Sequence, residues 1–353
     1  MKTPGHRPEE CARAARRGAE FILRFARRPR HFAEWGGDFL NYFYYLAATP
    51  ADADLRRRGR AAGAGLARRW RELNPTLAAD ADAETVYDLV YGSLHADLFG
   101  VRDPALKAKL KAAARRFSAS DFLWFDPASE PPPSDLPDRC RCGLWNDRGR
   151  KTCARCRRRL RMSSRYFVWY IALIRTYMAR RYGVSLGAGY ADVLRWRRAL
   201  LPYPADSSDA DFWDAAYAVT HVVYTLNDYD RYRLRPAWLP REFAFLKANV
   251  EGAVADDDVE MVGEFLDCLK CFGVGAESRL VREATDFLLA RQNADGSWGE
   301  TDTDDTYANY HVTLAAASGL TEIRWRGARL AFPEVAPLLR RMKGKKGVNR
   351  ERP

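Results

Sequence analysis

The stretch LLARQNADGSWGETDTDD, residues 288–305, joins two apolar segments through a sharp reversal of the chain. Apolar residues before it recur at helical spacing, and Asp295-Gly296 is a typical turn pair because glycine adopts backbone angles closed to other residues. The acidic residues that follow can accept hydrogen bonds from the free N–H groups of a new helix and suit the positive end of its dipole. The stretch therefore predicts a helix that ends in a tight turn and a second, capped helix beyond it.

The same helical periodicity extends over most of the chain, and the alternating pattern typical of strands is almost absent. We therefore expect an all-α protein in which short polar breaks separate a dozen or more helices. The predicted helices lie at about 8–28, 33–48, 52–73, 83–98, 104–117, 162–182, 187–199, 209–227, 240–250, 256–271, 277–292, 304–318 and 333–343.

Composition bounds the class of protein. The 353 residues are 47% hydrophobic and 12% aromatic, which is enough for a sizeable core in one large or two ordinary domains. The net charge of +12 comes largely from arginine-rich runs, which can attract nucleic acid or another acidic partner, although solvated helix faces explain them as well. Because no apolar run reaches membrane-spanning length and the first residues lack a signal-peptide core, we expect a cytoplasmic protein.

A proline-rich break divides the helical pattern. The segment DPASEPPPSDLPDRC, residues 126–140, cannot continue a helix because proline lacks the N–H donor and clashes with the preceding turn. We expect the two helical parts to form one domain, because neither has an obvious linker of its own. The predicted divisions are an N-terminal helical part, 1–125, a linker with a compact insertion, 126–160, a C-terminal helical part, 161–342, and a basic tail, 343–353.

The insertion contains four cysteines, Cys140, Cys142, Cys153 and Cys156, spaced as C-x-C, ten residues, then C-x-x-C. Two thiolate pairs on two turns can complete a tetrahedral Zn²⁺ site without a large core. The module is similar to a minimal zinc ribbon, and four thiolates would leave no open position for catalysis, so we expect a structural Zn²⁺. The alternatives are a reduced, metal-free loop or a redox pair at Cys153 and Cys156.

The stretch at 288–305 and its continuation resemble a known superfamily. Gln292 and the segment 295–299 resemble the QW motif of terpenoid cyclases. The following YHVTLAAASGL, residues 310–320, resembles an inner helix of protein prenyltransferase β subunits, in which the histidine is a zinc ligand. The resemblance implies an α/α toroid, with inner and outer helices around a central cavity, and a metal-ligating His311. Small residues at 315–318 would let such inner helices approach closely.

The acidic segment DTDDT, residues 302–306, resembles the acid motif of class II terpene cyclases. That resemblance implies Asp304 as the proton donor, supported by Asp305, since a carboxyl group can donate only if its neighbours keep it protonated. The alternative is that both aspartates cap the next helix.

A second pattern concerns the histidines. The frame Tyr-Ala-x-x-His-Val occurs at 217–222 and again at 307–312, and Tyr91 also precedes His95 by four residues. Positions i and i+4 share one face of a helix. Because the inner helices of a toroid would face the same axis, we predict that His95, His221 and His311 bind a catalytic Zn²⁺, Cu or Fe²⁺. Core histidines with satisfied hydrogen bonds are the alternative.

Asp228 follows His221 by two helical turns. It could act as a general base or a fourth ligand, or it could belong to the turn that ends the helix. The leading hypothesis from the sequence is thus a metal-dependent enzyme that acts on a small or medium organic substrate in an aromatic-lined cavity. The alternatives are terpene-cyclase-like, proton-initiated cyclisation through Asp304, and a non-catalytic scaffold whose zinc module and basic tail recruit a partner.

Overall fold

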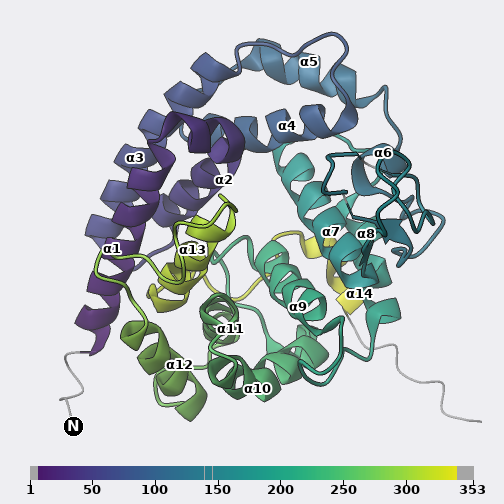
Figure 1. Ribbon diagram of the computed structural model, residues 1–353. Helices are drawn as coiled ribbons and strands as arrows, with labels where there is room; N and C mark the ends of the chain where they lie inside the picture. Colours follow the sequence, from purple (N-terminus) through teal and green to yellow (C-terminus); the bar gives the residue numbers. More distant parts are fainter. Residues whose placement is uncertain (1–6, 139, 145, 340–353) are drawn as a thin grey trace, which may run out of the picture.

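The computed structural model describes residues 7–138, 140–144 and 146–339, and helices dominate it (Figure 1). The prediction of an all-α protein is confirmed, while the basic tail at 343–353 lies outside the described residues. The α-helices within those residues are α1 (Arg7–Ala26), α2 (Pro29–Ala48), α3 (Ala53–Leu73), α4 (Ala83–Leu98), α5 (Pro104–Ala114), α6 (Ala119–Leu123), α7 (Arg165–Tyr182), α8 (Tyr190–Leu194), α9 (Phe212–Asn227), α10 (Pro240–Ala255), α11 (Val259–Cys271), α12 (Arg279–Ala290), α13 (Ala308–Leu320) and α14 (Ala336–Leu339).

Helix starts follow the capping chemistry of the sequence. Asp52, Asp82 and Ser164 each accept a hydrogen bond from a backbone N–H in the first turn of α3, α4 and α7. Several predicted helices differ from the structure, and the segment expected at 333–343 is a 3₁₀ turn followed by the short α14 within the described residues. The segment expected at 187–199 is the single turn α8 followed by a 3₁₀ segment, and the helix expected from 304 begins only at Ala308 as α13, because the acidic residues before it stay in the loop.

Six helices, α2, α4, α7, α9, α11 and α13, each pack against the next in this order and contribute side chains to one central cavity (Figure 1). Helix α13 then returns to α2, where the Tyr310 hydroxyl donates a hydrogen bond to Asp38 over 2.8 Å. Helices α1, α3, α5, α10 and α12 pack on the outer sides of these six. The N- and C-terminal helical parts therefore share one packed body, joined through the contacts of α1 with α13 and of α4 with α7.

The turn after α12 connects the end of the chain to its beginning. Trp298 is fully buried, and its indole N–H donates to the carbonyl of Leu288 over 2.7 Å. The side chain of Gln292 donates to the carbonyl of Ala14, in α1, over 2.9 Å. Gly296 has a φ of 95°, which favours glycine, so the D-G turn predicted from the sequence is present. This stretch stabilises the fold by holding α1, α12 and α13 together.

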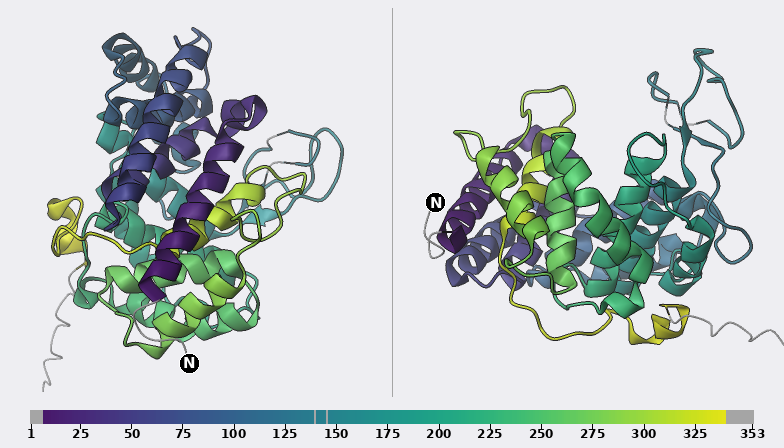
Figure 2. Two further views of the ribbon diagram at one scale, coloured as in Figure 1. Left: turned by 90° about the vertical axis from the view of Figure 1, so that its left-hand side faces the viewer. Right: turned by 90° about the horizontal axis from the view of Figure 1, so that it is seen from below.

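The insertion projects from the helical body (Figure 2). Its ends are joined by two short antiparallel strands, β1 (Leu136–Pro137) and β2 (Met162–Ser163), in which Leu136 pairs with Ser163. The helix expected from 162 therefore begins only at Arg165, as α7. The insertion has a small hydrophobic core, separate from that of the helical body, formed by Cys140, Cys153 and Leu160. Across the described part of the chain, none of the helices combines the length and apolar character needed to span a bilayer.

Candidate metal centres and the central cavity

The four cysteines of the insertion lie at metal-binding distance from one another. The Sγ atoms of Cys140 and Cys156 are 3.4 Å apart, those of Cys142 and Cys153 are 3.6 Å apart, and all four lie within 4.8 Å of one another. Metal–sulfur bonds of about 2.3 Å in a tetrahedron place sulfurs about 3.8 Å apart. The spacing predicted from the sequence therefore produces a cluster of the size that one such ion needs.

Two tight turns present these thiols. Gly143 and Arg157 each follow a cysteine pair and have positive φ angles of 85° and 62°. Their N–H groups donate to the carbonyls of Cys140 and Cys153 over 2.7 and 3.0 Å. Backbone N–H groups, chiefly that of Cys156, lower the pKa of the Cys153 thiol to about 6. A lowered pKa favours the thiolate, which is the form that binds a metal ion.

The central cavity has a volume of about 1050 Å³ and combines aromatic and acidic side chains. Arg175 is the one arginine among the described residues that line it, and this side chain pairs with Glu84. The cavity is therefore acidic although the chain as a whole is basic. Its carboxylates are Glu34, Asp38, Glu84, Asp88, Asp230, Glu264 and Asp267. Its aromatic residues, apart from the histidines, are Trp35, Tyr42, Tyr45, Trp70, Tyr87, Tyr91, Trp124, Tyr224, Tyr229, Tyr307 and Tyr310.

Two residues that line the cavity, His311 and Glu264, form with Glu260 a compact group of potential metal ligands, whose ligand atoms lie within 4.8 Å of one another. Glu260 and Glu264 are one turn apart on α11 and so share a face. His311, on α13, has its Nδ1 2.9 Å from Oε1 of Glu260. Within the described ranges, this group and the four cysteines are the two clusters of three or more side chains arranged closely enough to hold an ion.

Small residues bring α11 and α13 close enough to form this group. A Cβ added at Gly263 would lie 2.6 Å from the carbonyl oxygen of Ala315, and one added at Gly319 would lie 2.6 Å from the carbonyl oxygen of Gly263. Only glycine fits at these contacts without a backbone shift. The small residues expected to allow close packing therefore lie at the contact that brings the α11 carboxylates to His311.

Hydroxyl groups hold both carboxylates. Tyr217 donates to Glu260 over 2.6 Å, and Thr220 donates to Glu264 over 2.5 Å. Burial raises the pKa of Glu264 to about 7. Burial also opposes ionisation of Glu260 and His311, but their mutual attraction outweighs it, lowering the pKa of Glu260 and raising that of His311. Glu260 and His311 therefore each favour the charged form of the other, while Glu264 titrates close to neutral pH.

The three predicted histidines lie in two different environments. Nδ1 of His221 is 2.8 Å from the carbonyl of Tyr217, and burial lowers the pKa of His221 to about 4, so its neutral ring keeps Nε2 free to accept. His95 makes the same local contact, with Nδ1 2.9 Å from the carbonyl of Tyr91, but it is completely buried and does not line the cavity. The structure thus brings His221 and His311 to the cavity wall and leaves His95 in the core. In the described part of the chain, the three imidazoles do not form one ligand group.

The acidic motif lies outside the cavity. Asp305 accepts hydrogen bonds from the N–H groups of Tyr307 and Ala308 over 2.9 and 3.2 Å, which is the capping alternative. Asp304 is exposed, and neither aspartate lines the cavity. The position expected of a cyclase acid is therefore not occupied by this motif.

Asp228 lies at the end of α9, where it adopts a left-handed conformation with a φ of 60°. It accepts a hydrogen bond from Tyr177 over 2.5 Å and forms ion pairs with Arg181 and Arg231. Its carboxylate is almost fully buried and does not line the cavity. Of the two roles considered for Asp228, the structure shows the one at the helix end.

None of the seven carboxylates that line the cavity, nor Glu260 beside it, was predicted from the sequence as a site residue. Glu260 and Glu264 lie in VEMVGEFL and Asp38 lies in GGDFL, each within a largely apolar helical segment. Asp38 accepts the hydroxyl of Tyr310 over 2.8 Å, and burial raises the pKa of Asp38. A charged residue on an apolar helix face was the available signal, because such residues are rarely buried without a partner.

Comparison with known proteins places the chain in one family. A family model described as a domain of unknown function, DUF6895, matches residues 140–319, just over half of the chain. The matched region includes the four cysteines and extends through most of α13, so it contains His221, His311 and both α11 glutamates. No curated protein and no solved structure matches the chain. By the extent of that match, the chain belongs to the DUF6895 family.

Proposed function

We propose that this protein is a metal-dependent enzyme whose ion is held on the cavity wall by His311, Glu260 and Glu264. The observation that carries the proposal is the approach of three ligand atoms to within 4.8 Å at the edge of a large cavity. One imidazole and two carboxylates suit Zn²⁺, Fe²⁺ or Mn²⁺, and three protein ligands leave positions open to substrate. Such an ion would supply Lewis-acid chemistry or an activated water.

The surrounding residues have separate roles in this proposal. Tyr217 and Thr220 orient the two carboxylates through their hydroxyl hydrogen bonds, as outer contacts of metal sites do. His221, with Nδ1 directed to a carbonyl, offers an unprotonated Nε2 that can accept a proton from substrate or add a fourth ligand. Tyr170 stacks on His221 with ring centroids 5.0 Å apart, which holds the imidazole in place.

The cavity lining indicates a substrate class. Its volume of about 1050 Å³ suits a small or medium organic molecule. Aromatic faces and ionised carboxylates both attract positive charge, and seven carboxyl groups face a single arginine among the described lining residues. Burial raises the pKa of five of them, Asp38, Asp88, Asp230, Glu264 and Asp267, so a bound cation would favour their ionisation. The substrate that fits this chemistry carries an amine or another cationic group, which the acidic wall would orient toward the ion.

Two structural features complete the proposal. The succession of α2, α4, α7, α9, α11 and α13 around the cavity, and the contact between α13 and α2, support an α/α toroid. The sulfur distances in the insertion support a structural Zn²⁺ held by four thiolates. The ion would stabilise a module whose own hydrophobic core is small.

Metal analysis of the purified protein tests this proposal. We expect about two transition-metal ions per chain, one lost in Cys153→Ser and the other lost in His311→Ala/Glu264→Gln. Asp267→Asn is the matched control, because Asp267 lies on the next turn of α11 and lines the cavity but is outside the ligand group. A single ion that disappears with Cys153→Ser would contradict the catalytic centre. Retention of the second ion in the double variant would contradict it as well.

A second function is favoured by one observation. Asp38 is half-buried, accepts a hydrogen bond from Tyr310, and has a raised pKa, as a proton donor for an alkene requires. In this alternative Asp38, rather than Asp304, would start a terpene-cyclase-like cyclisation. Linear isoprenoid alkenes would then yield cyclic products in the presence of EDTA, detected by gas chromatography and mass spectrometry. Asp38→Asn should abolish these products and Asp304→Asn should not, and an absence of products in EDTA rejects this alternative.

A further inference from the structure

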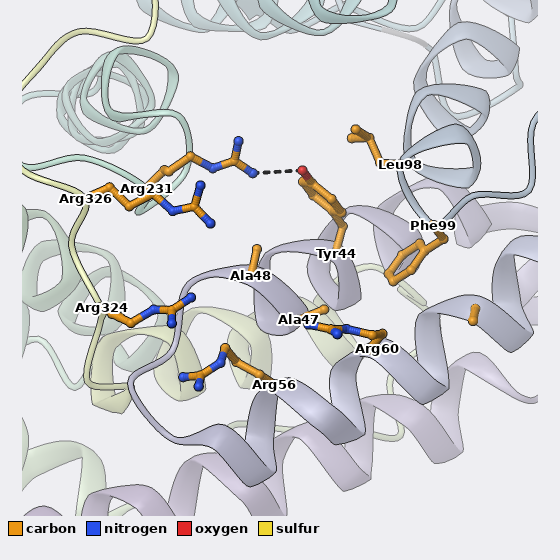
Figure 3. Close-up of a pocket in the computed structure, with 11 residues that line it drawn as sticks. Tyr44, Ala47, Ala48, Arg56, Arg60, Leu98, Phe99, Arg231, Arg324 and Arg326 are labelled. Atoms are coloured by element: carbon orange, nitrogen blue, oxygen red, sulfur yellow. Dashed lines mark hydrogen bonds between the residues drawn. The ribbon is translucent and has the colours of Figure 1, made fainter.

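A second pocket, separate from the central cavity, is lined by arginines from three parts of the chain (Figure 3). It has a volume of about 460 Å³, and no carboxylate is among the described residues that line it. We call it the arginine pocket. Its residues are Arg56, Arg60, Arg231, Arg324 and Arg326, with Tyr44, Ala47, Ala48, Ala64, Leu98 and Phe99.

An extended segment delivers two of these arginines. The N–H of Arg324 donates to the carbonyl of Thr49 over 2.8 Å, and the N–H of Arg326 donates to the carbonyl of Arg231 over 2.9 Å. Alternate residues of an extended chain point to the same side. Both guanidinium groups therefore face the pocket together with that of Arg231 (Figure 3).

Helix α3 delivers two more arginines. Arg56 and Arg60 are four residues apart and so lie on one face of the helix, where like charges destabilise it by a few tenths of a kcal/mol. Arg56 donates to the carbonyl of Ala51 over 2.8 Å and also to that of Pro50. Arg60 is exposed and has no side-chain acceptor among the described residues. An anion shared between these two arginines would remove their repulsion.

The pocket contains more positive charge than its neighbours balance. Arg231 donates to Tyr44 over 2.8 Å and lies 3.3 Å from Asp228, yet its Nε is buried without an acceptor in the described structure. The guanidinium groups of Arg324 and Arg326 likewise have no acceptor among the described side chains and carbonyls. The one contacting carboxylate, Asp228, also pairs with Arg181, so at least four of the five positive charges of the pocket are unbalanced.

We propose that the arginine pocket binds a small organic anion that carries two phosphate groups. Each phosphate group bears roughly 1.5 to 2 negative charges at neutral pH, so two of them match the unbalanced charge. The guanidinium fork binds phosphate oxygens in pairs. The volume is within the range of small-molecule sites, and Tyr44 and Phe99 provide aromatic surface for the organic part. The site shares no residue with the His311 group.

Calorimetric titration with inorganic diphosphate tests this site at constant ionic strength. We expect saturable binding of one diphosphate per chain, at least about tenfold tighter than that of inorganic phosphate, because a single phosphate reaches fewer guanidinium groups. Arg324→Gln/Arg326→Gln should weaken diphosphate binding at least about tenfold. Arg57→Gln/Arg58→Gln is the matched control. These two arginines pair with Asp54 outside the pocket, and the double substitution removes the same charge as the pocket variant. The diphosphate affinity of this control variant should remain within about twofold of that of the parent protein.

Several outcomes would overturn the proposal. Equal weakening in both double variants would indicate unspecific attraction to a basic surface, and unsaturable binding to the parent protein would reject the site. Cosedimentation with vesicles containing phosphatidylserine, or binding of single-stranded RNA, that depends on Arg324 and Arg326 without any diphosphate binding would assign the arginines to a macromolecule instead. Arg60→Gln is a second pocket variant for the case in which the double variant fails to fold, because Arg60 is exposed. A diphosphate affinity unchanged in Arg60→Gln would then contradict the proposal.

Discussion

Two neighbouring residues of α2 line two different pockets, one rich in arginines and the other rich in carboxyl groups. Tyr44 lines the arginine pocket, whose described lining includes five arginines, and Tyr45 lines the central cavity, whose described lining includes seven carboxylates and one arginine. The net charge of +12 indicates neither of these local potentials. Charges within a few ångströms of a ligand, in a medium of low dielectric constant, outweigh the screened charge of a distant surface. Ligand class in this protein therefore has to be inferred pocket by pocket.

A buried polar partition separates the two pockets. Asp228 pairs with Arg231 on the side of the arginine pocket and accepts the hydroxyl of Tyr177 on the other side. The hydroxyl of Tyr177 lies 3.3 Å from that of Tyr45, on the cavity wall. His95 packs between Tyr44 and Tyr45, with ring centroids 6.1 and 6.4 Å away. Variants in this partition should affect the two pockets differently, which makes the comparison testable.

The largest effect is expected from His95, because burial lowers the pKa of His95 to about 3. The folded state disfavours the charged ring, so the stability that this group contributes is present above pH 6.5 and is lost as the pH falls from 6.5 toward 3. We expect a loss of up to about 5 kcal/mol in unfolding free energy over that interval. Urea unfolding at a series of pH values should show a shallower pH dependence in His95→Gln. Parallel profiles for the two proteins would contradict the assignment.

The second effect is expected from Asp228→Asn, which leaves Arg181 and Arg231 without their carboxylate. Removing one partner of a buried ion pair should lower the unfolding free energy by about 3 kcal/mol. The same change adds positive charge to the arginine pocket, so diphosphate should bind more tightly while the metal content stays unchanged. Asp304→Asn is the control, because it removes an equal charge at an exposed position. Weaker diphosphate binding in Asp228→Asn would contradict the charge balance.

A smaller effect, confined to the central cavity, is expected from a substitution at Gly263. In Gly263→Ala, the added methyl group meets the backbone of Ala315, so α11 and α13 must separate. We expect about 2 kcal/mol of destabilisation and at least about tenfold weaker binding of the cavity ion, with diphosphate affinity unchanged. Gly252→Ala, on α10, is the matched control because nothing lies within 4 Å of its added methyl group. Metal titration monitored by calorimetry measures the difference, and equal metal affinities in the two variants would count against the α11–α13 contact.

The smallest effect should come from single hydroxyl groups on α2. Tyr44→Phe removes an acceptor of Arg231 and should change diphosphate affinity by about 1 kcal/mol, or roughly fivefold. Tyr45→Phe removes a contact with Tyr177 and should leave diphosphate affinity unchanged. Both variants lose one tyrosine hydroxyl, at adjacent positions. A difference between their diphosphate affinities, measured by calorimetry, therefore reflects which pocket each residue lines. Similar effects of the two variants would contradict the separation of the pockets.

Local sequence predicted much of the fold. Helical periodicity located α2, α3, α4, α9 and most other helices to within a few residues, and acidic or serine caps marked the starts of α3, α4 and α7. Both signals depend on neighbours three or four positions away. The spacing of the four cysteines predicted their cluster for the same reason, since each pair lies on its own tight turn. The acidic residues at 302–305 placed the predicted start of α13 too early, because acidic capping residues can lie several residues before the first turn of a helix.

The histidines show which features of the site the local sequence does not determine. His95 and His221 each follow a tyrosine by four residues and make the same contact of Nδ1 with the carbonyl of that tyrosine, so the sequence determined their local geometry. Only the packing of the helices decided that His221 faces the cavity while His95 is enclosed. Close packing at Gly263 likewise decided that His311 meets Glu260 rather than another histidine.

The arginine pocket repeats this lesson, since Arg56 and Arg326 are brought together by segments remote in the chain. The sequence by itself determined the helices, their ends and the cysteine cluster, because hydrogen bonds and side-chain periodicity within one element fix those features. The tertiary structure alone decided which charged side chains converge. That convergence depends on the distance between packed helices, which the close contact at Gly263 sets for α11 and α13.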